Sequence, residues 1–233
     1  MLARIREDIK AAKAKDPAAR GWLEIVICYP GLQAIWVYRV THWLWERGFR
    51  FCARVLGHLG RFLTGVEIHP AARIGRRLFI DHGMGIVIGE TAEIGEDCLM
   101  FKGVVLGGVS TEKKKRHPTL GNRVVVGTNA CILGPIEIGD DVMIGSGSVV
   151  IRPVPSGCTV VGVPGRVVNK QEKRRIAEEL NHGSLPDPVA DALRVVMDEQ
   201  RKLDERLRKL EGKNGSCADD QKPMTNNQAP NNK

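Results

Sequence analysis

Aliphatic residues recur at every sixth position over the middle of the chain. Three runs carry the pattern: Ile68 to Ile86, Ile88 to Leu106, and Leu120 to Val150. A helix repeats about every 3.6 residues and a plain strand every two, so neither accounts for a period of six. Glycine follows many of these aliphatics, as at Ile74 and Ile144. The pattern therefore predicts short strands and tight corners, three to a coil, stacked as a parallel β-helix.

The six-residue pattern is interrupted between Leu106 and Leu120, which are 14 residues apart. That interval is two repeats plus two residues. The segment between them, "GGVSTEKKKRHPT", is polar and charged and offers no aliphatic for an interior. We therefore expect residues 108–119 to leave the coil as an excursion loop.

The first quarter of the chain has a helical pattern instead. In "GLQAIWVYRVTHWLWERG" the apolar residues follow the i, i+3, i+4 spacing of one helix face, and Pro30 precedes them as a break. The residues on this face are Leu32, Ile35, Trp36, Val40, Trp43 and Leu44. We interpret the tryptophans as core residues and residues 1–62 as an α-helical domain.

Beyond residue 168 the six-residue repeat stops and a seven-residue spacing takes its place. Val189, Val196, Leu203 and Leu210 are seven apart, and Gln200 is the polar member of a parallel row. This spacing favours a self-associating helix over one packed on its own subunit. The predicted fold class is thus mixed. It has an α-helical domain (1–62), a β-helix domain (63–168), a C-terminal helical or coiled-coil extension (169–212) and a disordered tail (213–233).

Composition excludes several classes of protein. The chain has 233 residues, 42% hydrophobic content and a net charge of +8, but its basic run "KKKR" is not interleaved with aromatics, which argues against nucleic-acid binding. The apolar stretch at residues 22–40 contains Glu24, Pro30 and Arg39, so we expect no membrane span. The six cysteines are scattered and the N-terminus has no apolar signal segment, so we expect a reduced, cytoplasmic protein.

Several motifs together resemble serine O-acetyltransferase, the enzyme that acetylates L-serine from acetyl-CoA in the first committed step of cysteine biosynthesis. They are "VEIHPAARIGRRLFIDHGMGIVIGETAEIG", "LGG", "KRHP" and "GVPGRVV", with "DPAAR" and "HWLW" in the helical part. The resemblance extends from about residue 5 to residue 168. It implies the left-handed β-helix of the hexapeptide acyltransferases.

His82 of "IDHG" is the residue we expect to act as general base. A serine hydroxyl is a poor nucleophile near neutral pH, and an imidazole can accept its proton as it attacks the thioester. Such a base needs a carboxylate to orient it and to stabilise the imidazolium. The resemblance gives that role to the residue before "IHP", which is Asp in the family and Glu67 here.

Serine is a zwitterion, so its site needs a cation for the carboxylate and an anion for the ammonium group. The resemblance implies that Arg116 and His117 of the loop bind the carboxylate. It likewise implies that Asp81 and Asp16 bind the ammonium group.

Acetyl-CoA is the co-substrate that the resemblance implies, lying in a groove between two subunits. The family's contacts fall on Gly108, Thr128 and Ser146, and the last two replace the usual small alanines. Lys113 to Lys115 are open to two interpretations, as contacts for the CoA phosphates or as a solvated loop.

The same resemblance suggests how the protein assembles and is regulated. We expect a homotrimer with three shared active sites, or a dimer of such trimers, and feedback inhibition by L-cysteine. Family members commonly bind O-acetylserine sulfhydrylase through a C-terminal isoleucine. This sequence ends "NNQAPNNK", which argues against that complex.

Two other enzyme classes share this type of coil. A hexapeptide acetyltransferase acting on a sugar or an antibiotic hydroxyl is the principal alternative, and Asp16 with the Arg116–His117 pair favours an amino acid over it. A zinc lyase of the carbonic anhydrase type requires three histidine ligands, two of them five residues apart in that family. The histidines here, at 42, 58, 69, 82, 117 and 182, contain no such pair, so we expect no metal.

Overall fold

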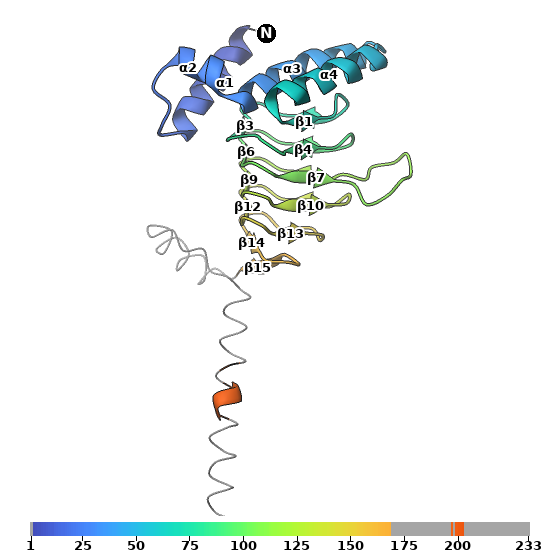
Figure 1. Cartoon of the computed structure of the whole chain (residues 1–233). Helices are drawn as coiled ribbons and strands as arrows, with labels where there is room; N and C mark the ends of the chain where they lie inside the picture. The colour runs from blue at the N-terminus through green and yellow to red at the C-terminus, as the bar shows by residue number, and fades with distance from the viewer. Residues whose placement is uncertain (1, 169–196, 198, 203–233) are drawn as a thin grey trace, which may run out of the picture. The chain divides into compact units, whose positions relative to one another are not determined.

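The computed structural model describes residues 2–168, 197 and 199–202 (Figure 1). The chain divides into two compact units, Met1–Asp187 and Pro188–Lys233. Every helix and strand named below belongs to the first unit, and the described residues of the second are helical. The remainder of the predicted C-terminal extension, with its seven-residue spacing, and the predicted disordered tail lie outside the described residues.

The described chain starts with four helices, and the coil follows the last of them. They are α1 (Leu2–Lys15), α2 (Trp22–Cys28), α3 (Pro30–Glu46) and α4 (Arg50–Thr64). Pro30 occupies the first turn of α3, where its missing N–H has no helical partner to lose. Gly65, with φ 72°, ends α4 in the left-handed conformation that glycine adopts without strain. Among the described residues, no helix has the length and apolar character needed to cross a membrane.

The helix α3 buries one face, which includes Leu32, Ile35 and Tyr38. The interpretation of the tryptophans of this segment as core residues is wrong for Trp43, which is 50% exposed. One face of α3 packs on the coil and on α4, and Trp43 lies on another. Its ring is covered instead by the guanidinium of Arg47, 4.0 Å from the ring centroid.

Short strands from three positions of each coil stack into three sheets. The first sheet contains β1 (Glu67–Ile68), β4 (Val87–Ile88), β7 (Val105–Gly107), β10 (Cys131–Leu133) and β13 (Val149–Val150). The second contains β2 (Arg73–Ile74), β5 (Glu93–Ile94), β8 (Thr119–Leu120) and β11 (Glu137–Ile138). The third contains β3 (Phe79–Ile80), β6 (Leu99–Met100), β9 (Val125–Val126), β12 (Met143–Ile144), β14 (Thr159–Val161) and β15 (Arg166–Val168). All pairs are parallel except β14 with β15.

The aliphatic residues of the six-residue pattern form the interior of the coil, which confirms the predicted parallel β-helix. Ile68, Ile88, Leu106 and Ile132 align along the first sheet and are buried. These rows, with their counterparts on the other two sheets, make up the main hydrophobic core. Burying such side chains contributes about 1.5–3 kcal/mol each.

One coil is longer than the sequence pattern indicated. Glu67 pairs with Val87, 20 residues later, whereas Val87 pairs with Val105 after 18. The six-residue step from Ile80 predicts Ile86 as the residue that aligns with Ile68 on the next coil, and this is wrong, because Ile88 pairs with Ile68. The two extra residues lie in the corner between β3 and β4, which carries Asp81 and His82.

A second departure is the loop between β7 and β8, residues 108–118, which has no helix or strand. Thr119 is the first residue of β8. Val105 pairs with Cys131, 26 residues later, so this coil has eight residues more than the coil before it. The interval from Leu106 to Leu120 is thus one repeat plus eight residues. Figure 1 shows the loop projecting beyond the end of β7.

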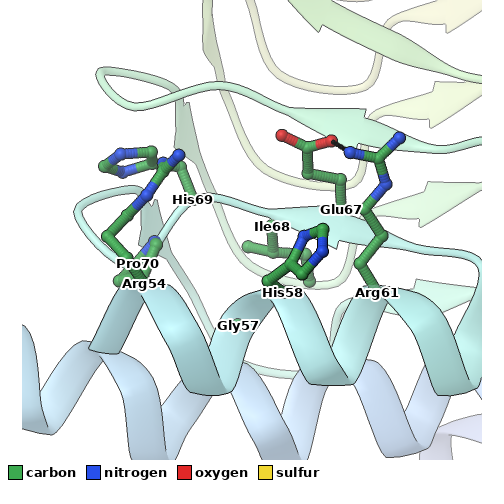
Figure 2. Close-up of a pocket in the computed structure, with 8 residues that line it drawn as sticks. All are labelled: Arg54, Gly57, His58, Arg61, Glu67, Ile68, His69 and Pro70. Carbon is green, nitrogen blue, oxygen red and sulfur yellow. Dashed lines mark ion pairs between the residues drawn. The ribbon is translucent and has the colours of Figure 1, made fainter. Parts of the chain in front are cut away.

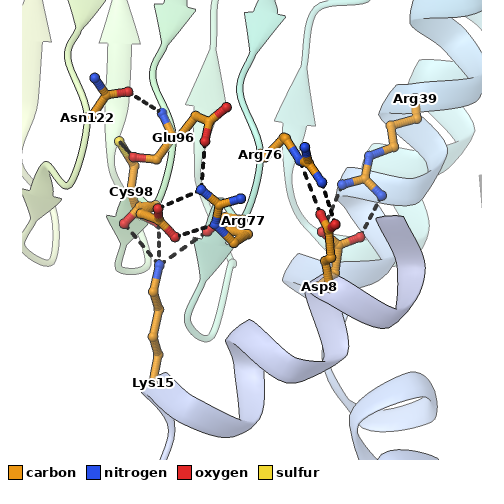
Figure 3. Close-up of polar contacts among 10 residues, drawn as sticks. Asp8, Lys15, Arg39, Arg76, Arg77, Glu96, Cys98 and Asn122 are labelled. Atoms are coloured by element: carbon orange, nitrogen blue, oxygen red, sulfur yellow. Dashed lines mark hydrogen bonds and ion pairs between the residues drawn. The ribbon is translucent and has the colours of Figure 1, made fainter. Parts of the chain in front are cut away.

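The helix α1 is bound to α3 near its middle and to the coil at its C-terminal end (Figure 3). Asp8 is buried and pairs with both terminal nitrogens of Arg39 on α3, at 2.5 and 2.8 Å. At the C-terminal end the Lys15 ammonium donates to the backbone carbonyls of Arg77, Asp97 and Cys98, at 3.0–3.2 Å. This contact fixes the end of α1, and therefore the residue after it, relative to the coil.

Candidate active site

Asp81 and His82 lie at the corner between β3 and β4. The backbone turns there through three left-handed residues, His82 with φ 60°, Gly83 with φ 72° and Gly85 with φ 80°. The N–H of Asp81 donates to the carbonyl of Met100 at 2.8 Å and holds the corner on the coil below. The His82 side chain is 75% exposed, and its Nε2 lies 3.9 Å from Oδ1 of Asp81. The imidazole is thus accessible to a small molecule and has a carboxylate beside it.

The helical part brings Asp16 to the same corner. The pKa of the Asp16 carboxyl is held below its ordinary value, chiefly by the hydrogen bond from Tyr29 and then by the N–H of Ala18, with a further contribution from nearby His82. Those two donors lie 2.5 and 2.8 Å from the carboxylate oxygens. The structure therefore places Asp16, Asp81 and His82 together, and we call this set, with Tyr29, the base corner.

Gly31 makes this approach of helix to coil possible. A Cβ at this position would lie 2.3 Å from the carbonyl oxygen of Ile80, far inside van der Waals contact. Only glycine allows α3 to pass so close to β3. As a result, the Tyr29 ring packs against Phe79 of β3, with ring centroids 6.4 Å apart.

Glu67 faces the helix α4 across a small cavity (Figure 2). This cavity of about 80 Å³ lies between α4 and β1 and is lined by Arg54, His58, Arg61, Glu67 and His69, among others. The Glu67 carboxylate pairs with Arg61, with Oε2 and Nη1 2.8 Å apart. In the described part of the chain its ion-pair partner is Arg61, and the role of Glu67 in orienting His82 stays a prediction.

His69, at the other end of the same cavity, is a neutral side chain. Burial lowers its pKa to about 4, and the positive charge of Arg54 adds to the effect. Its Nδ1 accepts a hydrogen bond from the N–H of Ala71 at 3.1 Å, and its ring meets the edge of Trp45 at 5.1 Å between centroids. These contacts support a structural role for His69.

Arg116 and His117, at the end of the excursion loop, are docked on Glu90 and Thr91. The Thr91 Oγ1 accepts hydrogen bonds from the backbone N–H groups of both loop residues, each at 3.1 Å. The Arg116 guanidinium donates to Glu90 at 2.5 Å. Lys115 donates to the carbonyl of Thr91 at 2.7 Å, so at least this lysine is engaged by the coil. We call Glu90, Thr91, Arg116 and His117 the loop corner.

The contacts of His117 determine which ring nitrogen can donate. Its Nδ1 accepts a hydrogen bond from the backbone N–H of Thr91 at 3.2 Å, so Nδ1 is unprotonated and Nε2 carries the proton. Burial, together with the charge of Arg116, lowers the pKa of His117, which keeps the ring neutral. The ring occupies space that only a glycine at position 89 leaves free, since a Cβ there would lie 2.0 Å from its Cδ2.

The predicted site residues thus fall into two groups that the structure does not bring together. The base corner precedes β4 and the loop corner follows it. Residues 87–89 alone span about 10 Å in an extended strand. In serine, by contrast, the carboxylate carbon and the hydroxyl-bearing carbon are both bonded to Cα. One serine molecule therefore cannot reach both groups of a single chain.

The residues predicted to contact acetyl-CoA are divided in the same way. Thr128 and Ser146 follow β9 and β12, at corners that stack below the one carrying His82, and the N–H of Gly147 donates to the carbonyl of Thr128 at 2.8 Å. Gly108 instead adjoins the loop corner, where a Cβ would lie 3.2 Å from Nε2 of His117.

The described residues hold no cluster of three or more His, Cys, Asp or Glu side chains arranged to bind a metal ion. The ionisable groups of the two corners instead make the hydrogen bonds and ion pairs given above.

Comparison with known proteins identifies the family. A model described as bacterial transferase hexapeptide (six repeats) matches residues 117–152. A serine acetyltransferase of Bacillus licheniformis is 50% identical over 207 residues, which cover 89% of this chain and 95% of that protein. The chain belongs to the serine acetyltransferase family.

Solved structures of serine acetyltransferases agree with this assignment. The Neisseria gonorrhoeae serine acetyltransferase in complex with serine is 41% identical, with a TM-score of 0.70, over 72% of this chain and 69% of that one. A serine acetyltransferase in complex with cysteine is 40% identical, with a TM-score of 0.71, over 72% and 70% of the two chains. The coil is accordingly the left-handed parallel β-helix of this family.

Three residues of this candidate site were missed by sequence reasoning. Tyr29 and Thr91 contact predicted site residues by hydrogen bonds, and Glu90 does so by an ion pair. Glu90 and Thr91 stand in the quoted motif, directly after a glycine that ends a six-residue step. The sequence therefore indicated that these two residues lie at a corner, but it did not indicate that they contact the loop.

Proposed function

We propose that this chain transfers the acetyl group of acetyl-CoA to the hydroxyl of L-serine, giving O-acetyl-L-serine and CoA. The observation that carries the proposal is the chemistry of the two corners. One presents an exposed imidazole beside a carboxylate, and the other presents a guanidinium and a neutral imidazole N–H. Together they match a small zwitterion that must lose a hydroxyl proton. The serine complex of a relative supports the same substrate.

His82 acts as the general base. Its Nε2 removes the hydroxyl proton as the serine oxygen attacks the thioester carbonyl. The tetrahedral intermediate then expels the CoA sulfur, and the imidazolium returns the proton to that leaving group. Asp81, 3.9 Å away, stabilises the imidazolium electrostatically. Glu67 orients the ring in this proposal, and its own carboxylate pairs with Arg61.

The zwitterion is bound at both ends. Asp16 and Asp81 accept hydrogen bonds from the ammonium group, and the substrate carboxylate takes the Nε2–H of His117 and free N–H groups of Arg116. A guanidinium has five N–H donors, so the bond to Glu90 leaves others available. Because burial keeps His117 neutral, it donates as an imidazole and keeps its Nδ1 contact with Thr91.

Two chains complete each site in this proposal. Serine cannot span the base corner and the loop corner of one chain, so each base corner faces the loop corner of a neighbour. Repeating this head-to-tail contact with closure gives a ring, and we propose a homotrimer with three shared sites. Pairing of two trimers through the helices would give the alternative, a dimer of trimers.

Acetyl-CoA binds along the same boundary. Thr128 and Ser146 lie on corners stacked below His82, and Gly108 lies beside His117. The pantetheine arm would therefore extend down the groove from the base toward later coils, with its thioester beside His82. L-cysteine has the same zwitterion with sulfur in place of oxygen, so we propose that it inhibits by occupying the serine site, as the cysteine complex of a relative suggests.

The test is thiol release from acetyl-CoA with different acceptors. We expect release to depend on L-serine and to yield O-acetyl-L-serine in equal amount by mass spectrometry. Sugar hydroxyls should give at least about 100-fold lower kcat/KM because they leave charged groups of the site unpaired. D-serine should be a similarly poor acceptor, because it cannot pair both of its charged groups and still place its hydroxyl at His82. Release that depends on a sugar or an antibiotic hydroxyl instead of serine would overturn the proposal and favour the alternative acyltransferase.

A further inference from the structure

Tyr29 contacts the proposed ammonium site without a role in the steps above. It lies between α2 and α3, outside both helices, with φ −106° and ψ 88°. Its hydroxyl donates to Oδ2 of Asp16 at 2.5 Å, and its ring packs on Phe79. Phe79 stands two residues before Asp81 on the chain. Tyr29 therefore connects Asp16 to the strand that leads into Asp81.

Asp16 depends on such contacts for its orientation. It follows the last residue of α1, and its side chain is only half-buried, so packing alone does not fix its rotamer. The backbone before it is anchored by Lys15, whose ammonium donates to three carbonyls of the coil. Ala18 donates to Oδ1 at 2.8 Å, which leaves Oδ2 to be set by Tyr29.

The Tyr29–Asp16 bond also stabilises the charged form of the carboxylate. Donation by Tyr29 is the largest cause of the lowered pKa of Asp16. The same bond, with burial, raises the pKa of Tyr29 to about 12. The phenol therefore remains a donor and the carboxylate remains an anion near neutral pH, where the ammonium group of serine is charged.

We propose that Tyr29 is a positioning residue that fixes the Asp16 carboxylate for the α-ammonium group of the amino-acid acceptor. The inference rests on the proposed function, since it assigns Tyr29 to the serine site. Tyr29 does not touch the reacting atoms. It strengthens binding of the acceptor. It thereby favours acceptors that carry an α-ammonium group over acceptors that lack one.

Tyr29→Phe tests this role because the phenyl ring keeps its packing on Phe79 and loses only the hydroxyl. We expect KM for L-serine to rise about 10-fold, the size of a lost hydrogen bond to a charged group, with kcat and KM for acetyl-CoA within about twofold of wild type. The pKa of Asp16 should return toward its ordinary value in the variant. Protonation of Asp16 then begins at higher pH, so the ratio of variant to wild-type KM for serine should increase as pH falls below 5 toward the ordinary Asp value of 3.8.

Tyr38→Phe is the matched control, on the helix α3 that follows Tyr29. The Tyr38 hydroxyl is buried and donates to the carbonyl of Ala72 at 2.7 Å, away from both corners. Its loss should lower stability and leave KM for serine unchanged.

Two outcomes would overturn the inference, and they differ. If Tyr29→Phe has the wild-type KM for serine at every pH, or changes the KM values of both substrates equally, the positioning role fails and the proposed function stands. If the wild-type enzyme shows no serine-dependent release, the proposed function fails, and the assignment of Tyr29 fails with it.

Discussion

Replacing His82 by alanine is expected to lower kcat for acetyl transfer by at least about 100-fold, the lower end of what a general base contributes. KM for acetyl-CoA should change little, because the variant retains the corners below His82 that carry Thr128 and Ser146. Initial rates of thiol release at saturating serine measure both quantities. Imidazole added to the variant should restore part of the rate, since His82 is 75% exposed and the truncated side chain leaves room.

The control for that experiment is His42→Asn. His42 contacts the carbonyl of Pro70 through Nδ1 at 2.7 Å, and the asparagine amide can replace that contact. Its kcat should match the wild type. If the His82→Ala enzyme keeps kcat within about threefold of wild type, another group accepts the serine proton, and the assignment of His82 as general base is wrong.

The second large effect is expected from Gly89→Ala. A Cβ at position 89 would lie 2.0 and 2.1 Å from Cδ2 and Nε2 of His117, so the ring must move away from the substrate carboxylate. We expect kcat/KM for serine to fall about 100-fold through the loss of an oriented hydrogen bond to a charged group, while KM for acetyl-CoA stays near the wild-type value.

Gly21→Ala is the matched control for the added methyl group, because nothing lies within 4 Å of a Cβ at that position. His117→Ala removes the ring without adding any atom to the coil, and we expect the same loss of kcat/KM for serine. It therefore tests the prediction even if Gly89→Ala folds poorly. Wild-type kcat/KM for serine in both Gly89→Ala and His117→Ala would contradict the assignment of the loop corner.

The coil was predictable because the six-residue spacing of its inward residues can be read directly along the sequence. Each inward position, such as Ile68 or Leu106, repeats at a fixed interval, and burial on the sheets follows from that interval alone. The extra residues at the β3–β4 corner were not recognised, because Ile86 fits the period of six as well as Ile88 does. Pairing of Glu67 with Val87 decides between them, and pairing is a property of the folded coil.

In the candidate site, only the residues that stand in recognisable motifs were predictable from the sequence. Asp81, His82, Arg116 and His117 stand in recognisable stretches, whereas Tyr29 is one aromatic among several in a helical segment. Its importance comes from Gly31, which lets α3 approach Ile80 and places the phenol on Asp16. Likewise, nothing in "GET" specifies that the Thr91 hydroxyl accepts from two residues of a loop that returns to it. Such contacts depend on tertiary geometry.

Mixing two inactive chains tests the central claim, that serine is acetylated at sites shared between subunits. His82→Ala retains an intact loop corner, and His117→Ala retains an intact base corner. Co-expressed in equal amounts, they should assemble trimers in which about one site in four combines two intact corners, giving about a quarter of wild-type serine-dependent thiol release. Activity no higher than the mean of the two separate variants would place the whole site within one chain and contradict the account.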